Sequence, residues 1–518
     1  MLFRSGFQPV TASLADLIGV EHVTVAAAAR TFLTGEDLDT LRQLAQEPVE
    51  FLPAAFLERQ EALLDRVGTR VVPPASGSPV RGASTVMFNA ATKSAQSPVS
   101  AVGWFRVGED GRLRLISKSE HYHAPLGHGF PGYALLERAR RLGIPNATHN
   151  NTRGQITRLL EEELVRVGNG LAADDRTGLD RVLAANDPYV VNRVLNLETG
   201  SLACEAALKM ILARFYAVEP GGAAPRYHGR TPVLLVMGND DGELQANYHG
   251  TTILAQTMRG MWPALLAKLD AAGICRVCPI RPNNTADLEA AFARWDRGAT
   301  KVAGFFHEIV MMNYGGRLLT PEFLQRAYAL CRAHDVPTVC DEIQSCLWHP
   351  DLFMFREWGL TPTFVAVGKG FPGGEYPASR LLFSAAMDSL PLFGALVTNG
   401  QEELASLAYL ITMRWAQANA AVTRTVGDYY EARLREFGAA HAAQITAIEG
   451  RRHMTTLYFR DLNAAKRFAG HLNDRGLDAS AQVYKADCPP VVLTKIPLIS
   501  TPVVVDFILD RMNEAIGA

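Results

Sequence analysis

Short apolar runs alternate with longer stretches of helical spacing between about residues 200 and 400. The runs that predict strands lie at 233–236, 302–306, 337–340, 364–367 and 380–383, and the helical patterns lie at about 252–272, 286–296 and 321–334. Strands separated by whole helices pair mainly in parallel, because the helix carries the chain back to the starting edge of the sheet. The alternation therefore predicts an α/β fold whose large domain has a mainly parallel sheet flanked by helices.

The whole chain is interpreted as four parts around this segment. Residues 1–100 are predicted to be an N-terminal helical extension and linker, 101–190 the first part of a small α+β domain, 191–400 the large domain, and 401–518 the second part of the small domain. In the first part, Thr34 is the expected N-cap of a helix, and proline, serine and glycine at 73–79 predict the linker.

Further local patterns support the small α+β domain. Two strands around a turn are expected at 102–116, and a strand is expected at 454–459. Helical patterns cover 404–437, 462–476 and 502–516.

Charge and cysteine content exclude several classes of protein. The 51 lysines and arginines nearly balance the 53 acids, which disfavours nucleic acid and anionic membranes as partners. The apolar runs fall short of the ~20 residues that span a bilayer, and the first residues lack a secretion-signal pattern. Seven sparse cysteines indicate a reducing compartment, so a cytoplasmic location is expected.

Ionisable residues follow three of the predicted strands. His307 with Glu308 and Asp341 with Glu342 come directly after two of them, and Lys369 follows a third between two glycines. Ligands of open parallel sheets bind beyond these carboxyl ends. An ordinary ion pair remains an alternative, but a phosphate-binding loop does not, because glycine stands where Ser or Thr must follow the lysine. Imine formation is the strongest rationale for such a lysine.

A strongly helical stretch begins at Gly200 and Ser201. Ser201 is the expected N-cap, and the first amides of a helix can hold a phosphate group. Taken alone, the pattern predicts only a helix start.

These motifs, in this order, resemble the class III aminotransferases, which are pyridoxal-phosphate enzymes of fold type I. The segment 200–209 resembles the Gly-Ser-Glu-Ala-x-Glu-Ala-Ala-x-Lys helix of that family, and Tyr248-His249-Gly250 resembles its aromatic-His-Gly segment. The segment 341–344 resembles Asp-Glu-Val-Gln, and 367–374 resembles the lysine loop. Asp110-Gly111 and the segment 126–131 match the amino-terminal pattern.

The resemblance implies a fold type I enzyme with pyridoxal 5'-phosphate as cofactor. Lys369 would form the internal aldimine and shuttle the proton, and Asp341 would pair with the pyridine nitrogen. The implied cofactor-binding residues are Gly200, Ser201, Leu202, Tyr248, His249, Glu308, Asp341, Gln344, Lys369 and Thr398. No metal ligand is implied.

Individual roles follow from the same resemblance. Tyr248 would stack on the ring, Gln344 would approach its phenolic oxygen, and Gly200 with Ser201 would hold the phosphate. Thr398 would reach the phosphate of a neighbouring subunit in a homodimer with shared active sites. The role of Glu308 stays open.

The implied reaction moves an amino group between a small amine or amino acid and a keto acid or aldehyde. An aminomutase or racemase on the same scaffold is the alternative, and a non-catalytic relative is disfavoured by Lys369 and Asp341. Leu202 replaces the acid that usually follows Gly-Ser in the family. The carboxylate-binding arginine of the family has no counterpart directly before Gly450, because Arg451 and Arg452 stand one or two positions late.

Three further segments are candidate functional sites. Cys275 and Cys278 have metal or redox spacing without a second pair, so ordinary buried thiols are favoured. His121 and His123 are expected to line the cleft or face solvent. The segment 150–153 either reaches the mouth of the active site or forms only a turn.

Overall fold

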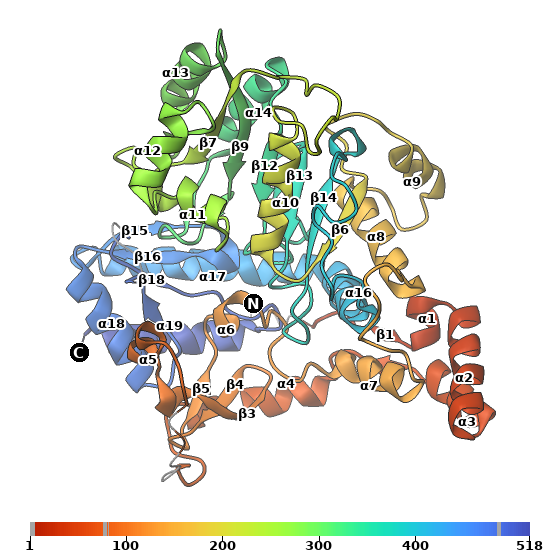
Figure 1. The fold of residues 1–518 in the computed structure, drawn as a ribbon. Helices are drawn as coiled ribbons and strands as arrows, with labels where there is room; N and C mark the ends of the chain where they lie inside the picture. Colours follow the sequence, from red (N-terminus) through yellow and green to blue (C-terminus); the bar gives the residue numbers. More distant parts are fainter. Residues whose placement is uncertain (1–5, 76–79, 81, 484–487, 518) are drawn as a thin grey trace.

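A central sheet organises the molecule (Figure 1). The computed structural model describes residues 6–75, 80, 82–483 and 488–517, and within them seven strands form this sheet in the order β6-β14-β13-β12-β9-β7-β8. The strands are β6 (Arg193–Leu197), β7 (Thr231–Met237), β8 (Arg276–Ile280), β9 (Thr300–His307), β12 (Thr338–Asp341), β13 (Phe364–Val367) and β14 (Ser379–Phe383). All neighbours pair in parallel except β14, which is antiparallel to both of its neighbours. The predicted mainly parallel sheet is confirmed.

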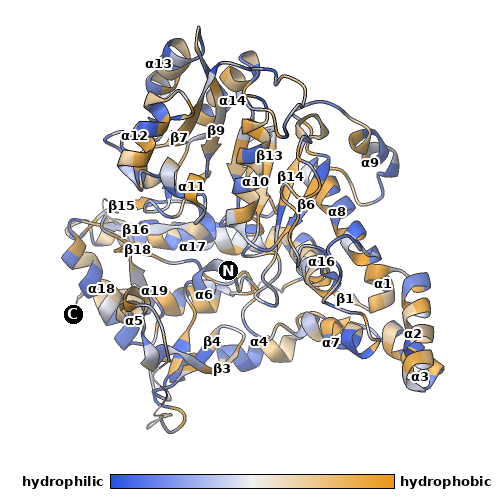
Figure 2. Ribbon diagram, in the orientation of Figure 1, coloured by the Kyte–Doolittle hydropathy of each residue, from blue (hydrophilic) through white to orange (hydrophobic). Residues whose placement is uncertain are grey.

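Strands β6 and β8 were missed by the sequence patterns. β6 reads Arg-Val-Leu-Asn-Leu and β8 reads Arg-Val-Cys-Pro-Ile, so polar or proline residues interrupt both apolar runs. Both lie at edges of the sheet, where a strand is covered by fewer neighbours and needs less apolar sequence. The inner strands are coloured mainly as hydrophobic in Figure 2.

Helices cover the sheet. They are α10 (Gly200–Leu212), α11 (Ile253–Met258), α12 (Pro263–Ala271), α13 (Thr285–Trp295) and α14 (Pro321–Ala333). The single helix expected at 252–272 is wrong, because Gly260 has a positive φ and Pro263 opens a new helix. The small elements β10 (Val310–Met311), β11 (Arg317–Leu318) and α15 (Met354–Glu357) complete this part.

The C-terminal part contains an antiparallel sheet of four strands within the described residues. Its strands are β15 (Ile445–Glu449), β16 (Thr456–Phe459), β17 (Ser480–Ala481) and β18 (Val491–Leu493), and its helices are α16 (Glu403–Ala418), α17 (Ala420–Ala440), α18 (Leu462–Asp474) and α19 (Pro502–Ile516). The helix expected at 404–437 is broken at Asn419, whose side chain binds the backbone of Gln8 and Trp415.

The segment 98–183 contains three strands and four helices. β3 (Pro98–Val102), β4 (Phe105–Gly108) and β5 (Leu113–Leu115) form one antiparallel sheet, where two strands were expected. Leu115 also bridges to Leu477, so this sheet is joined to the C-terminal part. The helices are α6 (Ser119–Tyr122), α7 (Ala134–Arg141), α8 (Gln155–Gly168) and α9 (Arg176–Leu183).

The N-terminal residues pack against the rest of the chain. They form the pair β1 (Thr11–Ala12) and β2 (Val49–Glu50) and the helices α1 (Leu14–Ile18), α2 (Val20–Thr34), α3 (Leu38–Gln46), α4 (Ala54–Glu61) and α5 (Val86–Ala91). Helices α1 and α3 contact α7 at one edge of the molecule (Figure 1). Thr34 is the last residue of α2, and Asp37 is the N-cap that accepts from the Thr40 amide, so the Thr34 prediction is wrong.

Most of the predicted linker, 76–79, lies outside the described residues. In the described part of the chain, every helix is too short or too polar to cross a membrane.

Candidate active site

A cleft of about 550 Å³ opens at the carboxyl ends of β12 and β13. Asp341 is the last residue of β12, and Lys369 stands two residues after the end of β13. Six of the residues predicted from the sequence line this cleft: Gly200, Ser201, Tyr248, Asp341, Gln344 and Lys369. The expectation that chemistry gathers at these strand ends is therefore met in the folded chain.

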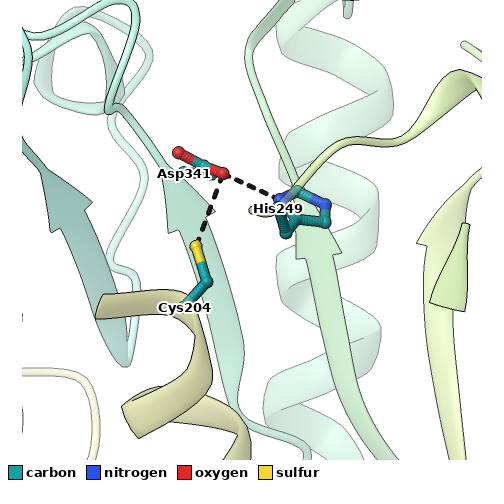
Figure 3. Close-up of side chains that lie close together, drawn as sticks. All are labelled: Cys204, His249 and Asp341. Carbon is teal, nitrogen blue, oxygen red and sulfur yellow. Dashed lines mark hydrogen bonds and ion pairs between the residues drawn. The ribbon is translucent and has the colours of Figure 1, made fainter. Parts of the chain in front are cut away.

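Asp341 is held by hydrogen bonds from three directions, two of which Figure 3 shows. His249 Nδ1 lies 2.8 Å from Oδ2, and Cys204 Sγ lies 3.5 Å from the same oxygen. The Ile343 amide donates to Oδ1 over 3.1 Å. Only 4% of the surface of Asp341 is exposed. A carboxylate accepts but never donates when ionised, so these three donors fix the orientation of the Asp341 side chain.

Cys204, His249 and Asp341 are close enough together to invite comparison with a metal site. A thiol binds a metal as thiolate. Burial raises the pKa of the Cys204 thiol, and the neighbouring Asp341 raises it further. The protonated thiol donates to Asp341, which accounts for the short distance between the two side chains.

Lys369 faces the cleft beside aromatic and charged groups. Its Nζ lies 5.7 Å from the centre of the Tyr122 ring. Burial lowers the pKa of the Lys369 amine, while the acids Glu308 and Asp341 partly oppose this effect and the cation Lys118 adds to it. A lysine with a lowered pKa more readily presents the free amine that nucleophilic attack on a carbonyl requires.

The start of α10 forms one wall of the cleft. Thr199, not Ser201, is the N-cap, because the Thr199 side chain accepts the Leu202 amide. Ser201 lies inside the helix, and its Oγ accepts the Thr251 amide over 3.1 Å. The predicted cap is wrong by two residues, but Ser201 still lines the cleft.

Two glycines bring this wall close to its neighbours. A Cβ on Gly200 would stand 2.3 Å from the Ile343 side chain, and a Cβ on Gly250, which has a φ of +113°, would stand 2.6 Å from Ser201. The first amides of a helix have no partner inside it. The cleft therefore meets a helix start of the kind that binds anions.

Gln344 connects the cleft to a buried acid. Its Nε2 donates to Glu308 Oε1 over 3.0 Å, and its backbone oxygen accepts from Lys495. The Arg259 guanidinium lies 5.5 Å from the centre of the Tyr248 ring, which also lines the cleft.

Several predicted residues lie outside the cleft wall. His249 and Glu308 are buried and do not line the cleft. The Leu202 amide donates to the Thr199 side chain, and Thr398 is exposed in the loop before α16. The segment 150–153 is also absent from the described wall residues, and His149 accepts from Thr152 in a turn. The turn interpretation of that segment is the one the structure supports.

The two arginines near Gly450 are used elsewhere. Arg451 and Arg452 form ion pairs with Glu357, and Arg452 also pairs with Asp428.

Cys278 lies in β8 and Cys275 directly before it, and both are partly buried. Burial raises the pKa of both thiols, as expected for ordinary buried cysteines.

The sequence reasoning missed two buried lysines near the cleft. Lys495 follows β18 and lies 4.5 and 4.3 Å from the ring centres of Tyr122 and Trp348. Lys118 follows β5. Both lysines stand shortly after strands of the smaller sheets, so their positions after strands are the signal that could have found them. His121 and His123 do line the cleft, as expected.

Comparison with known proteins places these features in a family. The family model described as Aminotransferase class-III matches residues 157–516. The ornithine aminotransferase of Emericella nidulans is 29% identical over 202 residues, which are 36% of this chain and 40% of that protein. The ornithine aminotransferase of Schizosaccharomyces pombe is 28% identical over 289 residues, 53% of this chain and 56% of that protein. The matches thus span about half the length of these relatives.

A solved structure agrees with the family match. The pyridoxamine-phosphate-bound aminotransferase of Vibrio fluvialis superposes with a TM-score of 0.65 at 19% identity, covering 85% of this chain and 96% of that one. This similarity confirms the predicted fold type I.

Proposed function

Because the chain belongs to the class III aminotransferases, we propose that it moves an amino group between a small amine or amino acid and a keto acid or aldehyde. The observation that carries the proposal is that Lys369 and Asp341 line one cleft at the carboxyl ends of two neighbouring parallel strands. The names of the relatives, ornithine aminotransferases, support an amino acid with a second amino group as one donor.

Membership of the family makes pyridoxal phosphate the cofactor of this chain. When bound, this group accepts the amino group of the donor and withdraws electrons from the reacting carbon. The residues of the cleft fit it: a glycine-bounded helix start suits a phosphate, and a fixed, buried carboxylate suits a protonated ring nitrogen.

Lys369 is proposed to bind the cofactor carbonyl through Nζ and to move the proton at the reacting carbon. Its lowered pKa supports both tasks, because the amine must be deprotonated to attack and to take up a proton. Asp341 is proposed to pair with the ring nitrogen, with His249 and Cys204 holding the carboxylate in place.

The remaining positions are proposed to orient and anchor the cofactor. Gly200 and Ser201 hold the phosphate, Tyr248 stacks on the ring, and Gln344 approaches the ring oxygen. Glu308 fixes the Gln344 side chain by accepting a hydrogen bond from its amide nitrogen. Leu202 contributes through its position in the first turn of α10.

We also propose a homodimer in the cytoplasm. Thr398 is exposed and does not line the cleft of its own chain, which supports a contribution to the site of a second subunit. The near-neutral charge and sparse cysteines support a cytosolic enzyme of small molecules.

The decisive experiment compares Lys369→Ala with the unmodified protein. The wild type is expected to be yellow after purification with pyridoxal phosphate and to become covalently labelled on borohydride reduction. Lys369→Ala should lose the covalent label and at least about 100-fold in transamination rate, which is the usual scale for removing a proton-transfer group. Lys369→Arg, which keeps the positive charge, should fail in the same way.

The reaction type is read from the need for an acceptor. After a donor has bleached the yellow form, added keto acid should restore the colour. Wild-type protein that neither colours nor labels contradicts the proposal. Turnover that needs no external acceptor would identify the aminomutase or racemase instead.

A further inference from the structure

A second cavity, of about 700 Å³, adjoins the cleft. His121 lies in the wall of both cavities, so the two meet at this side chain. Three lysines line the second cavity, Lys93 and Lys466 at exposed positions and Lys118 at a buried one. Asp474 is the one acid in its described wall, so the cavity carries an excess of positive charge.

Lys118 is the unusual member of this set. Only 8% of its surface is exposed, and no hydrogen bond or ion pair reaches its Nζ from residues 6–75, 80, 82–483 or 488–517. The other buried lysines have partners: Lys301 pairs with Asp296 at 2.6 Å, and Lys495 donates to the Gln344 carbonyl. The Lys118 side chain is thus largely buried, and it lines the cavity without a described protein partner for its ammonium group, an arrangement that suits an anionic ligand.

The electrostatics of the surroundings agree with a missing anion. Burial lowers the pKa of Lys118, with Asp478 opposing and Lys93 and Arg106 adding to the effect. Loss of hydration, together with Lys369 and Lys118 nearby, lowers the pKa of His121 to about 3. The surroundings of His121 are therefore cationic, while the imidazole itself is neutral.

The backbone around His121 is strained. Ser119, Glu120, His121 and Tyr122 all have positive φ, between 46° and 76°, which non-glycine residues rarely adopt. Contacts fix the turn at several points: Ser119 Oγ donates to the Lys495 carbonyl over 2.6 Å, and Glu120 accepts from Arg106 and His128. Strain that the surroundings enforce is typical of ligand sites.

We propose that the second cavity is a subsite for an oxyanion, a carboxylate or a phosphate ester, at the end of the substrate remote from the reacting amine. Lys118 binds the oxyanion at the base, and Lys93 and Lys466 attract it at the rim. The subsite rests on the proposed function, since it assigns the far end of a substrate whose near end meets Lys369. A charge-assisted hydrogen bond from a partly desolvated lysine gives such a site both affinity and selectivity.

Direct binding tests the subsite without any turnover. Glutarate and inorganic phosphate are titrated separately into the cofactor-loaded protein, and heat or ligand NMR signals are followed. At least one probe should bind saturably to the wild type, and Lys118→Met should weaken it about tenfold or more. Lys118→Arg should retain binding, and Lys268→Met, an exposed lysine on α12, serves as the matched control. The probe that binds identifies the carboxylate or the phosphate as the chemistry.

Donor kinetics separate this proposal from the proposed function. With 5-aminopentanoate, 3-aminopropyl phosphate and pentylamine as donors, Lys118→Met should raise KM about tenfold or more only for a donor that carries an oxyanion. A yellow, active protein whose probes bind equally well before and after Lys118→Met overturns the subsite and leaves the aminotransferase proposal standing. A protein without colour or label contradicts the aminotransferase proposal instead.

Discussion

At the scale of single residues, Asp341 shows how the site depends on side chains that are distant in sequence. Its oxygen Oδ2 accepts from His249 and Cys204, which lie 92 and 137 positions away along the chain. The second ring nitrogen of His249 is buried with no hydrogen-bond partner among the described residues. The histidine therefore serves mainly to position the carboxylate.

Replacing that histidine tests its positioning role. His249→Phe keeps a ring of similar shape and removes the donor, which costs about 1.5–3 kcal/mol when the acceptor is charged. We expect kcat/KM to fall about ten- to a hundredfold, measured as initial rates at saturating cofactor.

Cys204→Ala is the matched control, because it removes the weaker sulfur donor from the same oxygen. Its loss should be the smaller of the two. Full activity in His249→Phe would show that the Asp341 carboxylate needs no support from the ring.

At the scale of elements, the start of α10 separates two tasks that the sequence placed on one residue. Thr199 caps the helix, while Ser201, two residues further along the chain, accepts the amide of Thr251. A helix start that binds an anion needs its cap outside the binding position, because the cap side chain must satisfy an amide of its own.

Two single substitutions distinguish the tasks. Thr199→Ala should lower the stability of the cofactor-free protein by about 1 kcal/mol, the usual loss of an N-cap. Ser201→Ala should leave that stability nearly unchanged and weaken cofactor binding. Urea unfolding measures the stability, and cofactor titration measures the binding. If Ser201→Ala lowered the stability and Thr199→Ala did not, Ser201 would be the N-cap.

At the scale of the whole molecule, the N-terminal residues are part of the folded body. Phe7 packs on Trp415 with ring centres 5.5 Å apart, and Phe51 packs on Phe130 at 6.3 Å. Glu61 accepts from Thr501, and Gln60 accepts the Trp104 amide, so contacts reach both the C-terminal part and the sheet of β3–β5. The four domain boundaries stay a prediction.

A matched pair of phenylalanines tests this packing. Phe7→Ala should destabilise the protein by about 1.5 kcal/mol, the lower end for an apolar side chain that loses its burial. Phe32→Ala should change little, because Phe32 is 89% exposed. Thermal unfolding compares them, and equal midpoints would mean that the N-terminal residues add nothing to the stability of the body.

The sequence by itself determined the class of fold and the core of the candidate site. Burial on both faces demands apolar runs in inner strands, so the strand at 364–367 was placed as the structure has it. The helical spacing of apolar residues placed the helix at 502–516 in the same way. Lys369 and Asp341 were found because the ends of parallel strands converge by topology alone. Edge strands such as β6 escaped, since a partly covered strand needs no apolar run.

Only the tertiary structure decided which side chains support these residues. Contacts such as those of Asp341 with His249 and of Phe7 with Trp415 join segments that no local pattern connects. The burial of Lys118 likewise comes from segments that are distant in the sequence. The physical reason is that periodicity records whether a residue is buried but not what it is buried against. The candidate site depends on both: the sequence supplies Lys369 and Asp341, and packing decides which groups surround them.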